Sequence, residues 1–165
     1  MTMINSEIVL RGPEWTTLLD AMAGKIFKTY YQIFVLCAAI GIFEDKKEKI
    51  SNQEFIRTIP ISVVYNDNNK SLDYLFKVAV ITTKHLDSSP EKRLAIAFDE
   101  NNKDISRVNF LVEFGNAGMR ELLKTISKND LEMMQNIKDL LDNLKKRDFI
   151  DMMGIELDID FNTLQ

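Results

Sequence analysis

The chain has 165 residues, a length typical of one domain, and its 45% hydrophobic and 28% charged residues are those of a globular protein. Six glycines and three prolines are few for a β-rich fold, and the single cysteine excludes an internal disulfide, as expected in a reducing cytoplasm. The formal net charge of −4 argues against tight nonspecific binding to duplex DNA through overall charge.

The N-terminal residues predict a short β segment followed by a helix. Residues 1–10 carry neither a basic n-region nor a long apolar run, so we expect no export or membrane anchoring and place the protein in the cytoplasm. The β-prone run 8–10 ends before Gly12 and Pro13, and proline is favoured at the first position of a helix. Four apolar residues at helical spacing then give residues 13–25 one buried face: Trp15, Leu18, Leu19 and Met22.

The most apolar stretch of the chain, residues 27–43, predicts a buried central helix. It is short for a bilayer span, and Tyr30, Tyr31 and Gln32 place polar groups where hydrocarbon would penalise them. A helix that is apolar nearly all round must be surrounded by other elements in a folded domain. Thr29 can cap this helix, and the small residues near its end predict close packing against a helix or loop: Ala38, Ala39 and Gly41.

The middle of the chain predicts one extended segment and three further helices. The β-prone residues around Pro60, from Ile59 to Val64, indicate an edge strand that could pair with the N-terminal run. Helices are expected over 71–84, over 90–98 with Ser89 as the cap, and from Asp104 to Ile126. The last of these contains two glycines, which predict a break, a kink or the close approach of another backbone: Gly115 and Gly118.

The final helix is expected to begin with Asp130 as its cap and to carry an apolar stripe of Leu131, Met134, Ile137, Leu141 and Leu144. The predicted fold is therefore mainly α, a compact bundle of about six helices around a buried central helix with one or two short β segments. Residues 1–147 are assigned to a single helical domain, and residues 148–165 to an acidic tail. Within this tail, apolar residues alternate with acidic ones, a period typical of a strand: Ile155, Leu157, Ile159 and Phe161. The tail either adds a strand to a sheet of this fold or of a partner, or is disordered.

Residue types that carry catalysis are sparse in this sequence. His85 is the only histidine, and Cys37 has no second cysteine with which to form a zinc site. Because Cys37 lies in the most apolar stretch, burial should raise the pKa of its thiol and remove it from any pairing with His85. The sequence also lacks a glycine-rich phosphate loop. We therefore expect a protein that is not an enzyme and holds neither a metal nor a cofactor.

Two stretches resemble a known family: FKTYYQIFVLCAAIGIF at residues 27–43 and EFGNAGMREL at residues 113–122. They are similar to the dnd system-associated proteins, which are encoded beside bacterial DNA phosphorothioation and restriction genes. The resemblance extends in order over roughly residues 11–145, and its pattern is matched by Phe27, Lys28, Thr29, Tyr30, Ala38, Ala39, Gly41, Asn116 and Gly118. It implies a noncatalytic accessory subunit of a multi-protein anti-phage defence system, acting with an ATPase, a nuclease or a DNA-modification partner. Where members of the family tend to carry arginine after the apolar helix, this chain has the mixed run EDKKEK, which weakens a nucleic-acid contact there.

Three interpretations of function follow from these features. The leading one is the accessory subunit, with contacts to other defence proteins and only an indirect contact to nucleic acid; no membrane is involved, and homo-oligomerisation stays open. The alternative is a DNA-binding sensor or regulator that uses one of two local basic patches. One patch consists of Lys25, Lys28, Lys46, Lys47 and Lys49, and the other of Lys145, Lys146 and Arg147. A third is an acidic tail that mimics nucleic acid. Partner or DNA contacts are expected at Lys28, Tyr30, Lys46, Lys47 and Lys49, and a tail interface at Ile155, Leu157, Ile159 and Phe161.

Overall fold

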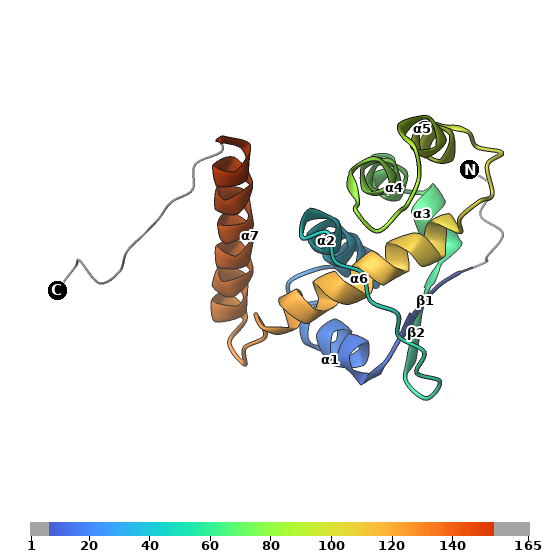
Figure 1. The fold of residues 1–165 in the computed structure, drawn as a ribbon. Helices are drawn as coiled ribbons and strands as arrows, with labels where there is room; N and C mark the ends of the chain where they lie inside the picture. Colours follow the sequence, from blue (N-terminus) through green and yellow to red (C-terminus); the bar gives the residue numbers. More distant parts are fainter. Residues whose placement is uncertain (1–6, 154–165) are drawn as a thin grey trace. The chain divides into compact units, whose positions relative to one another are not determined.

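The computed structural model describes residues 7–153, with side chains to residue 147. The chain divides into two compact units, Met1–Ile126 and Ser127–Gln165. The described part of the first unit contains β1 (Glu7–Arg11), α1 (Pro13–Met22), α2 (Tyr30–Phe43), β2 (Ile56–Pro60), α3 (Ile61–Tyr65), α4 (Ser71–Thr82), α5 (Pro90–Phe98) and α6 (Arg107–Leu123) (Figure 1). The second contains α7 (Asp130–Met153). The predicted mainly α fold with short β segments is confirmed, whereas the predicted domain boundary at residue 147 stays a prediction.

Helices α2 and α6 form the centre of the first unit, and their main chains touch (Figure 1). A Cβ atom on Gly118 would overlap the carbonyl oxygen of Cys37, and one on Gly41 would overlap the carbonyl oxygen of Phe114. Glycine at both positions lets the two backbones approach as closely as small residues allow at helix interfaces. Helix α6 runs unbroken through Gly115 and Gly118. The predicted close approach of another backbone is therefore confirmed for Gly118, whereas a Cβ atom on Gly115 would meet the ring of Phe34.

Helix α1 covers one side of this pair with the apolar face predicted from its spacing. The side chains of Trp15, Leu18, Leu19 and Met22 are fully buried. The indole of Trp15 lies 6.3 Å from the ring of Phe34 on α2, centroid to centroid. Aromatic pairs at such distances add to the stabilisation that burial gives. The predicted central position of α2 holds as well, because eight of its residues are buried, among them Ile33, Phe34 and Cys37.

Strands β1 and β2 form a two-stranded antiparallel sheet in which Ile8 faces Ile59. The predicted pairing of the N-terminal run with the run around Pro60 is confirmed for Ile59 and Pro60, and the strand extends back to Ile56. Ile8, Leu10 and Ile59 are buried. The expected extended conformation after Pro60 is wrong, because Ile61–Tyr65 forms the short helix α3. Pro60 is the last residue of β2 and directly precedes α3, and the helical turn that follows it buries Val64.

Side-chain caps mark where most of the predicted helices begin. Thr29 and Ser89 accept hydrogen bonds from the backbone N–H groups of Gln32 and Lys92, as predicted. Helix α6 begins at Arg107 and not at Asp104, since the hydroxyl of Ser106 accepts from the N–H of Asn109 at 3.3 Å.

The cap of α7 also differs from the prediction by one residue. The side-chain oxygen of Asn129 accepts hydrogen bonds from the N–H groups of Leu131 and Glu132, at 2.9 and 3.2 Å. The capping side chain is therefore Asn129, and Asp130 is the first residue of the helix. Asparagine and aspartate cap equally well, so the sequence NDLE could not decide between them.

Candidate functional site

Strand β1 has a free edge, and its hydrogen-bonding pattern shows which backbone groups lie there. Just beyond the strand, the N–H of Gly12 donates to the carbonyl of Phe55 at 2.8 Å. Because hydrogen-bonded pairs alternate along an antiparallel ladder, Leu10 and Ile8 are the residues of β1 that bond to β2. The alternate residues of β1 therefore direct their N–H and C=O groups away from β2.

The outward-facing residues of β1 are Glu7, Val9 and Arg11. Among the described residues the sheet contains no third strand, so this edge has no strand partner there. Pro60 lies opposite Glu7, at a position where the ladder needs no N–H. The backbone groups of the free edge are available to another extended chain, as unpaired strand edges are in general.

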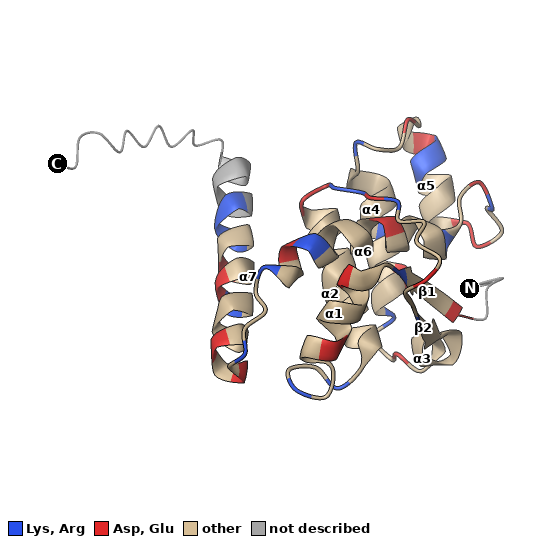
Figure 2. Cartoon of the chain, turned by 90° about the horizontal axis from the view of Figure 1, so that it is seen from below, with Lys and Arg blue, Asp and Glu red and all other residues tan. Residues whose placement is uncertain are grey.

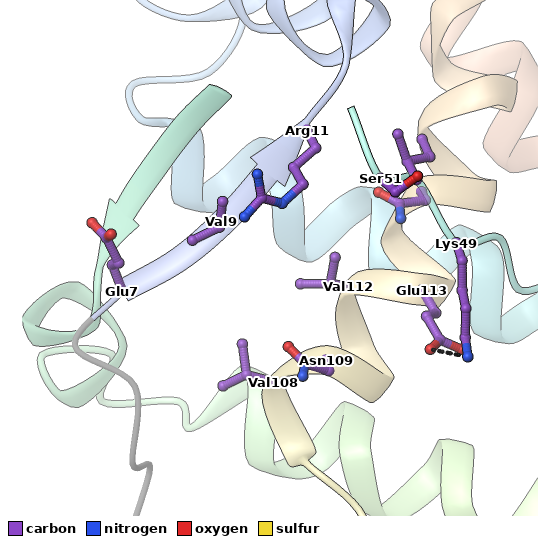
Figure 3. A pocket seen from close by; sticks show the side chains of 11 residues that line it. Glu7, Val9, Arg11, Lys49, Ser51, Val108, Asn109, Val112 and Glu113 are labelled. Atoms are coloured by element: carbon purple, nitrogen blue, oxygen red, sulfur yellow. Dashed lines mark ion pairs between the residues drawn. The ribbon is translucent and has the colours of Figure 1, made fainter. Parts of the chain in front are cut away.

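A groove of about 440 Å³ runs along this free edge (Figure 3). Strand β1 forms one wall and residues 49–51 form the other. The remaining lining residues come from α6: Val108, Asn109, Val112, Glu113 and Asn116. A volume of this size lies in the range of ligand-binding clefts. The groove thus combines a row of main-chain groups with a partly apolar floor.

A buried amide holds the wall formed by residues 49–51 in place. Asn116, only 3% exposed, accepts a hydrogen bond from the indole N–H of Trp15 at 2.8 Å and donates to the carbonyl of Glu48 at 2.9 Å. The N–H of Glu48 also donates to the carbonyl of Glu113 at 2.9 Å. Buried polar groups that satisfy one another in this way fix the geometry of a segment. The wall of the groove is therefore anchored to the core of the unit by hydrogen bonds.

Arg120 reinforces the same wall through an ion-pair network. Its guanidinium donates to both carboxylate oxygens of Glu48, at 2.7 and 3.0 Å, and to Glu14 on α1 at 2.9 Å. The hydrogen bond from Arg120 is the main reason that the pKa of Glu14 lies below its ordinary value, and the pKa of Arg120 is raised in turn. Arg120, Glu14 and Glu48 are partly exposed, so the network holds the wall in position but adds little to the stability of the fold.

The three predicted lysine contacts after α2 are held beside acidic groups. Lys47 pairs with Glu113 at 2.9 Å and also lies over the ring of Phe110. Lys46 pairs with Glu44 at 2.9 Å, and Lys49 approaches Glu113 at 3.9 Å with 85% of its side chain exposed. Figure 2 shows basic and acidic residues interspersed along the chain. Only Lys49 of the three lines the groove.

The other two predicted contacts lie at the opposite end of α2. Lys28 precedes the helix and is exposed, and Tyr30 is its half-buried first residue. The 14 residues of α2 separate them from the lysines after it by about 20 Å of helix. The structure therefore does not bring the five predicted residues together. The predicted tail interface of Ile155, Leu157, Ile159 and Phe161 lies outside the described residues.

Arg11 supplies a cation at the groove that the sequence did not single out. Its guanidinium reaches the carbonyl of Asn52 at 3.4 Å and the side-chain oxygen of Gln53 at 3.5 Å. Both acceptors are neutral, and within residues 7–147 no carboxylate lies within ion-pair distance of Arg11. One signal in the sequence pointed here: with only two β segments, a sheet must leave one edge of each strand free. The choice of edge, however, depended on the position of α6.

A second hollow, of about 350 Å³, lies beside Tyr31, Asp67 and Leu72. Of its three carboxylates, that of Asp67 is engaged within the fold, because it accepts from the hydroxyl of Tyr31 at 2.8 Å and from the N–H of Ser71 at 3.0 Å. Burial alone would raise the pKa of Asp67, but the hydrogen bonds from Ser71 and Tyr31 outweigh it and lower the pKa to about 2. These contacts hold the turn before α4, so the hollow has a structural explanation.

The residues weighed for catalysis lie apart from the groove. Cys37 is completely buried in α2, and this burial raises the pKa of its thiol. The ring of His85 lies 2.6 Å from the carbonyl of Asp45. Within residues 7–147, no group of three or more His, Cys, Asp or Glu side chains is arranged to hold a metal ion. None of the helices in the described part of the chain has both the length and the apolar character needed to cross a bilayer.

Comparisons with known proteins add no family to these observations. The sequence matches no protein-family model, no curated protein and no solved structure. The groove along β1 is therefore the feature on which a function can be argued.

Proposed function

We propose that this chain is a noncatalytic accessory subunit that binds an extended segment of a partner protein along the free edge of β1. The observation that supports the proposal is the position of the groove beside the outward-facing backbone of Val9 and Arg11. A segment added to a sheet edge gains main-chain hydrogen bonds, and neighbouring pockets select its alternate side chains. The groove offers both.

The composition of the groove favours a peptide over other ligands. Its floor includes Val108 and Val112, which are apolar. Its polar side chains come from all three lining segments: Glu7 and Arg11 on β1, Lys49 and Ser51 on the opposite wall, and Asn109, Glu113 and Asn116 on α6. A small polar metabolite would need several convergent donors or acceptors. An extended peptide instead uses a row of backbone groups and an apolar floor.

The resemblance to dnd system-associated proteins supplies the cellular context of the proposal. It implies that the partner belongs to a cytoplasmic anti-phage defence system and is an ATPase, a nuclease or a DNA-modifying enzyme. The groove gives such a subunit a means of attachment without chemistry of its own.

The alternative of direct DNA binding through local basic patches has less support from the geometry. Lys46 and Lys47 lie within 2.9 Å of Glu44 and Glu113, and a phosphate would have to compete with these carboxylates. Contacts to phosphates through several lysines would show as a steep loss of affinity with salt. A mobility-shift titration at low and physiological salt tests this alternative.

The proposed function is tested by placing proline on one edge of the sheet at a time. Val9→Pro removes an N–H that faces the groove, and Thr58→Pro removes the N–H at the paired position on the outer edge of β2. Neither N–H belongs to the β1–β2 ladder, so both variants should fold and unfold like the parent protein. We expect products of neighbouring genes to co-purify with the parent and with Thr58→Pro, and their binding to Val9→Pro to weaken at least tenfold in a titration.

Two results would count against the proposal. If Val9→Pro and Thr58→Pro retain the same partner with equal affinity, the groove is not where the partner binds. If no neighbouring gene product accompanies the parent protein even at low salt, the chain is not an accessory subunit. Thermal unfolding of both variants confirms that any loss of binding does not come from loss of the fold.

A further inference from the structure

The C-terminal residues of the chain have the pattern that the groove would select. Resting on the proposed function of the groove as a strand acceptor, we infer that residues 155–161 of a second copy of this chain occupy it when no partner is bound. Each copy then donates one segment and accepts one. The inference depends on three properties of the groove: its floor, its length and its charge.

The apolar part of the floor suits the apolar half of the segment, and Asn109, Glu113 and Asn116 form the polar part of the same floor. Side chains of a strand alternate between two faces, so an added strand directs every second residue toward α6. There it would meet Val108, which is 7% exposed, and Val112. The alternate residues of the segment are all large and apolar: Ile155, Leu157, Ile159 and Phe161.

The length of the segment suits the edge that it would cover. Strand β1 has five residues, or about 17 Å of strand, and residues 155–161 in an extended conformation span about 23 Å. The last described helix ends at Met153, and the segment lies within the twelve residues that follow it, 154–165. Five of its residues are enough to pair with the whole of β1.

The groove is lined by two basic and two acidic side chains, and its basic pair, Arg11 and Lys49, can receive carboxylates of the segment. Arg11 bonds only to neutral acceptors among the described residues, and Lys49 is 85% exposed with Glu113 at 3.9 Å as its partner. The residues of the segment that would point away from the floor are acidic: Glu156, Asp158 and Asp160. Glu7 lies at the other end of β1, where a further carboxylate would be repelled. An antiparallel addition places the first carboxylates near Arg11 and the neutral Asn162 near Glu7.

Exchange between two copies gives a closed assembly. A reciprocal contact, in which the same segment and the same groove are used twice, has two-fold symmetry and leaves neither groove empty. It also sets a condition on partner binding, because a partner segment must displace the one from the second copy. Self-association and partner binding are then mutually exclusive.

The experiment measures the dimer dissociation constant of the full chain by analytical ultracentrifugation. Leu157→Ser with Ile159→Ser should raise this constant at least tenfold, since the apolar half of the segment is lost. Leu164→Ser, which removes an apolar residue of the tail outside the segment, is the matched control and should leave it unchanged. Val9→Pro should also raise the constant, whereas Thr58→Pro should not.

A charge reversal tests the orientation at the groove. Lys49→Glu should weaken the dimer, and Asp158→Lys in the same chain should restore part of the lost affinity. Lys49 is largely exposed, so its replacement does not disturb the core. A dimer that responds to neither change has its charges paired elsewhere, and the proposed placement of the acidic residues is then wrong.

The outcomes separate this inference from the proposed function. A parent chain that stays monomeric at all concentrations overturns the exchange between copies, even if Val9→Pro still abolishes binding of a partner protein. A dimer that survives both Val9→Pro and the double substitution in the tail overturns it as well. A dimer that depends on Val9 but not on Leu157 and Ile159 shows that another segment occupies the groove, which also contradicts the inference. The proposed function is contradicted by different results: equal partner binding by Val9→Pro and Thr58→Pro, or no partner that accompanies the parent protein.

Discussion

The backbone is closely packed where α2 contacts α6, whereas it is open along the free edge of β1. At the first, Gly41 and Gly118 bring two main chains together until no atom can be added between them. At the second, the N–H and C=O groups of Val9 and Arg11 face a groove of about 440 Å³. One site has completed its contacts within the fold, and the other has kept part of its backbone unused.

The difference shows where this fold holds stability and where it can accept a ligand. Closed backbone contact in the core makes the α2–α6 pair rigid, since close-packed interiors have no room to adjust. The edge of β1 rests on that rigid pair through α6, so its unpaired groups are held at fixed positions. A preorganised edge loses less conformational entropy on binding than a flexible one.

The largest effect is expected from Gly118→Ala, which tests the closed half of the comparison. The added methyl would overlap the carbonyl oxygen of Cys37, and neither helix can retreat without opening the core. We expect the free energy of unfolding to fall by more than about 3 kcal/mol. Chemical denaturation followed by circular dichroism measures the loss.

Gly24→Ala provides the matched control for this prediction. Gly24 has a φ of +75°, but no atom lies within 4 Å of the position of an added Cβ. Only the left-handed backbone is strained there, at about 1 kcal/mol. If Gly118→Ala costs no more than Gly24→Ala, the close contact of the two main chains does not limit the packing of α2 on α6.

A smaller effect is expected from Asn116→Ala, which links the core to the groove. The substitution leaves the buried indole N–H of Trp15 without its acceptor and releases the carbonyl of Glu48. We expect a loss of about 2 kcal/mol in unfolding free energy. Hydrogen exchange should also become faster over residues 48–51, because the wall of the groove loses its anchor.

A double-mutant cycle with Trp15→Phe isolates the hydrogen bond between the two side chains. In the Trp15→Phe background no indole N–H is present, so Asn116→Ala should cost less there than in the parent. An equal cost in both backgrounds would show that the amide contributes only its volume. Asn109→Ala, at an exposed residue of α6, should change stability by less than about 0.5 kcal/mol.

The smallest effect is expected from the ion pair between Glu14 and Arg120, and it depends on pH. Because the pKa of Glu14 is lowered in the folded protein, its contribution is complete above the ordinary glutamate pKa of about 4.3 and is lost as the pH falls below it. The pair is partly exposed, so the loss should stay under about 1 kcal/mol. Denaturation of the parent and Glu14→Gln at pH 6 and pH 3.5 measures it. The two proteins should differ most at pH 6 and less at pH 3.5, because the contribution fades as the pH falls toward the lowered pKa of the folded state. A constant difference would contradict the assignment.

Much of the fold could be predicted from the sequence because its helices carry their signals locally. The buried face of α1 follows from the spacing of Trp15, Leu18 and Leu19, and the start of α5 follows from Ser89 and Pro90. The limits of α3 and α6 could not be predicted in the same way. The limits of α3 depend on the burial of Val64, and the start of α6 depends on the side chain that accepts from the N–H of Asn109. Both are decided by the tertiary structure.

The candidate site was harder to predict than the fold because its parts are distant in sequence. Lys49 was singled out for its charge, but its neighbours Val9 and Val112 are ordinary apolar residues. Nothing local distinguishes them from core positions. They become a site only because the register of β1 turns one backbone edge toward α6, which no periodicity within either segment encodes.

The proline at the end of β2 bears on how many molecules can join the sheet. Pro60 removes a donor from the outer edge, and the chain turns at once into α3. The sheet can therefore lengthen on the β1 side and is obstructed on the β2 side. A segment that joins the sheet is therefore expected on the β1 side, and stacking through both edges at once, which leads two-sided sheets to fibres, is disfavoured.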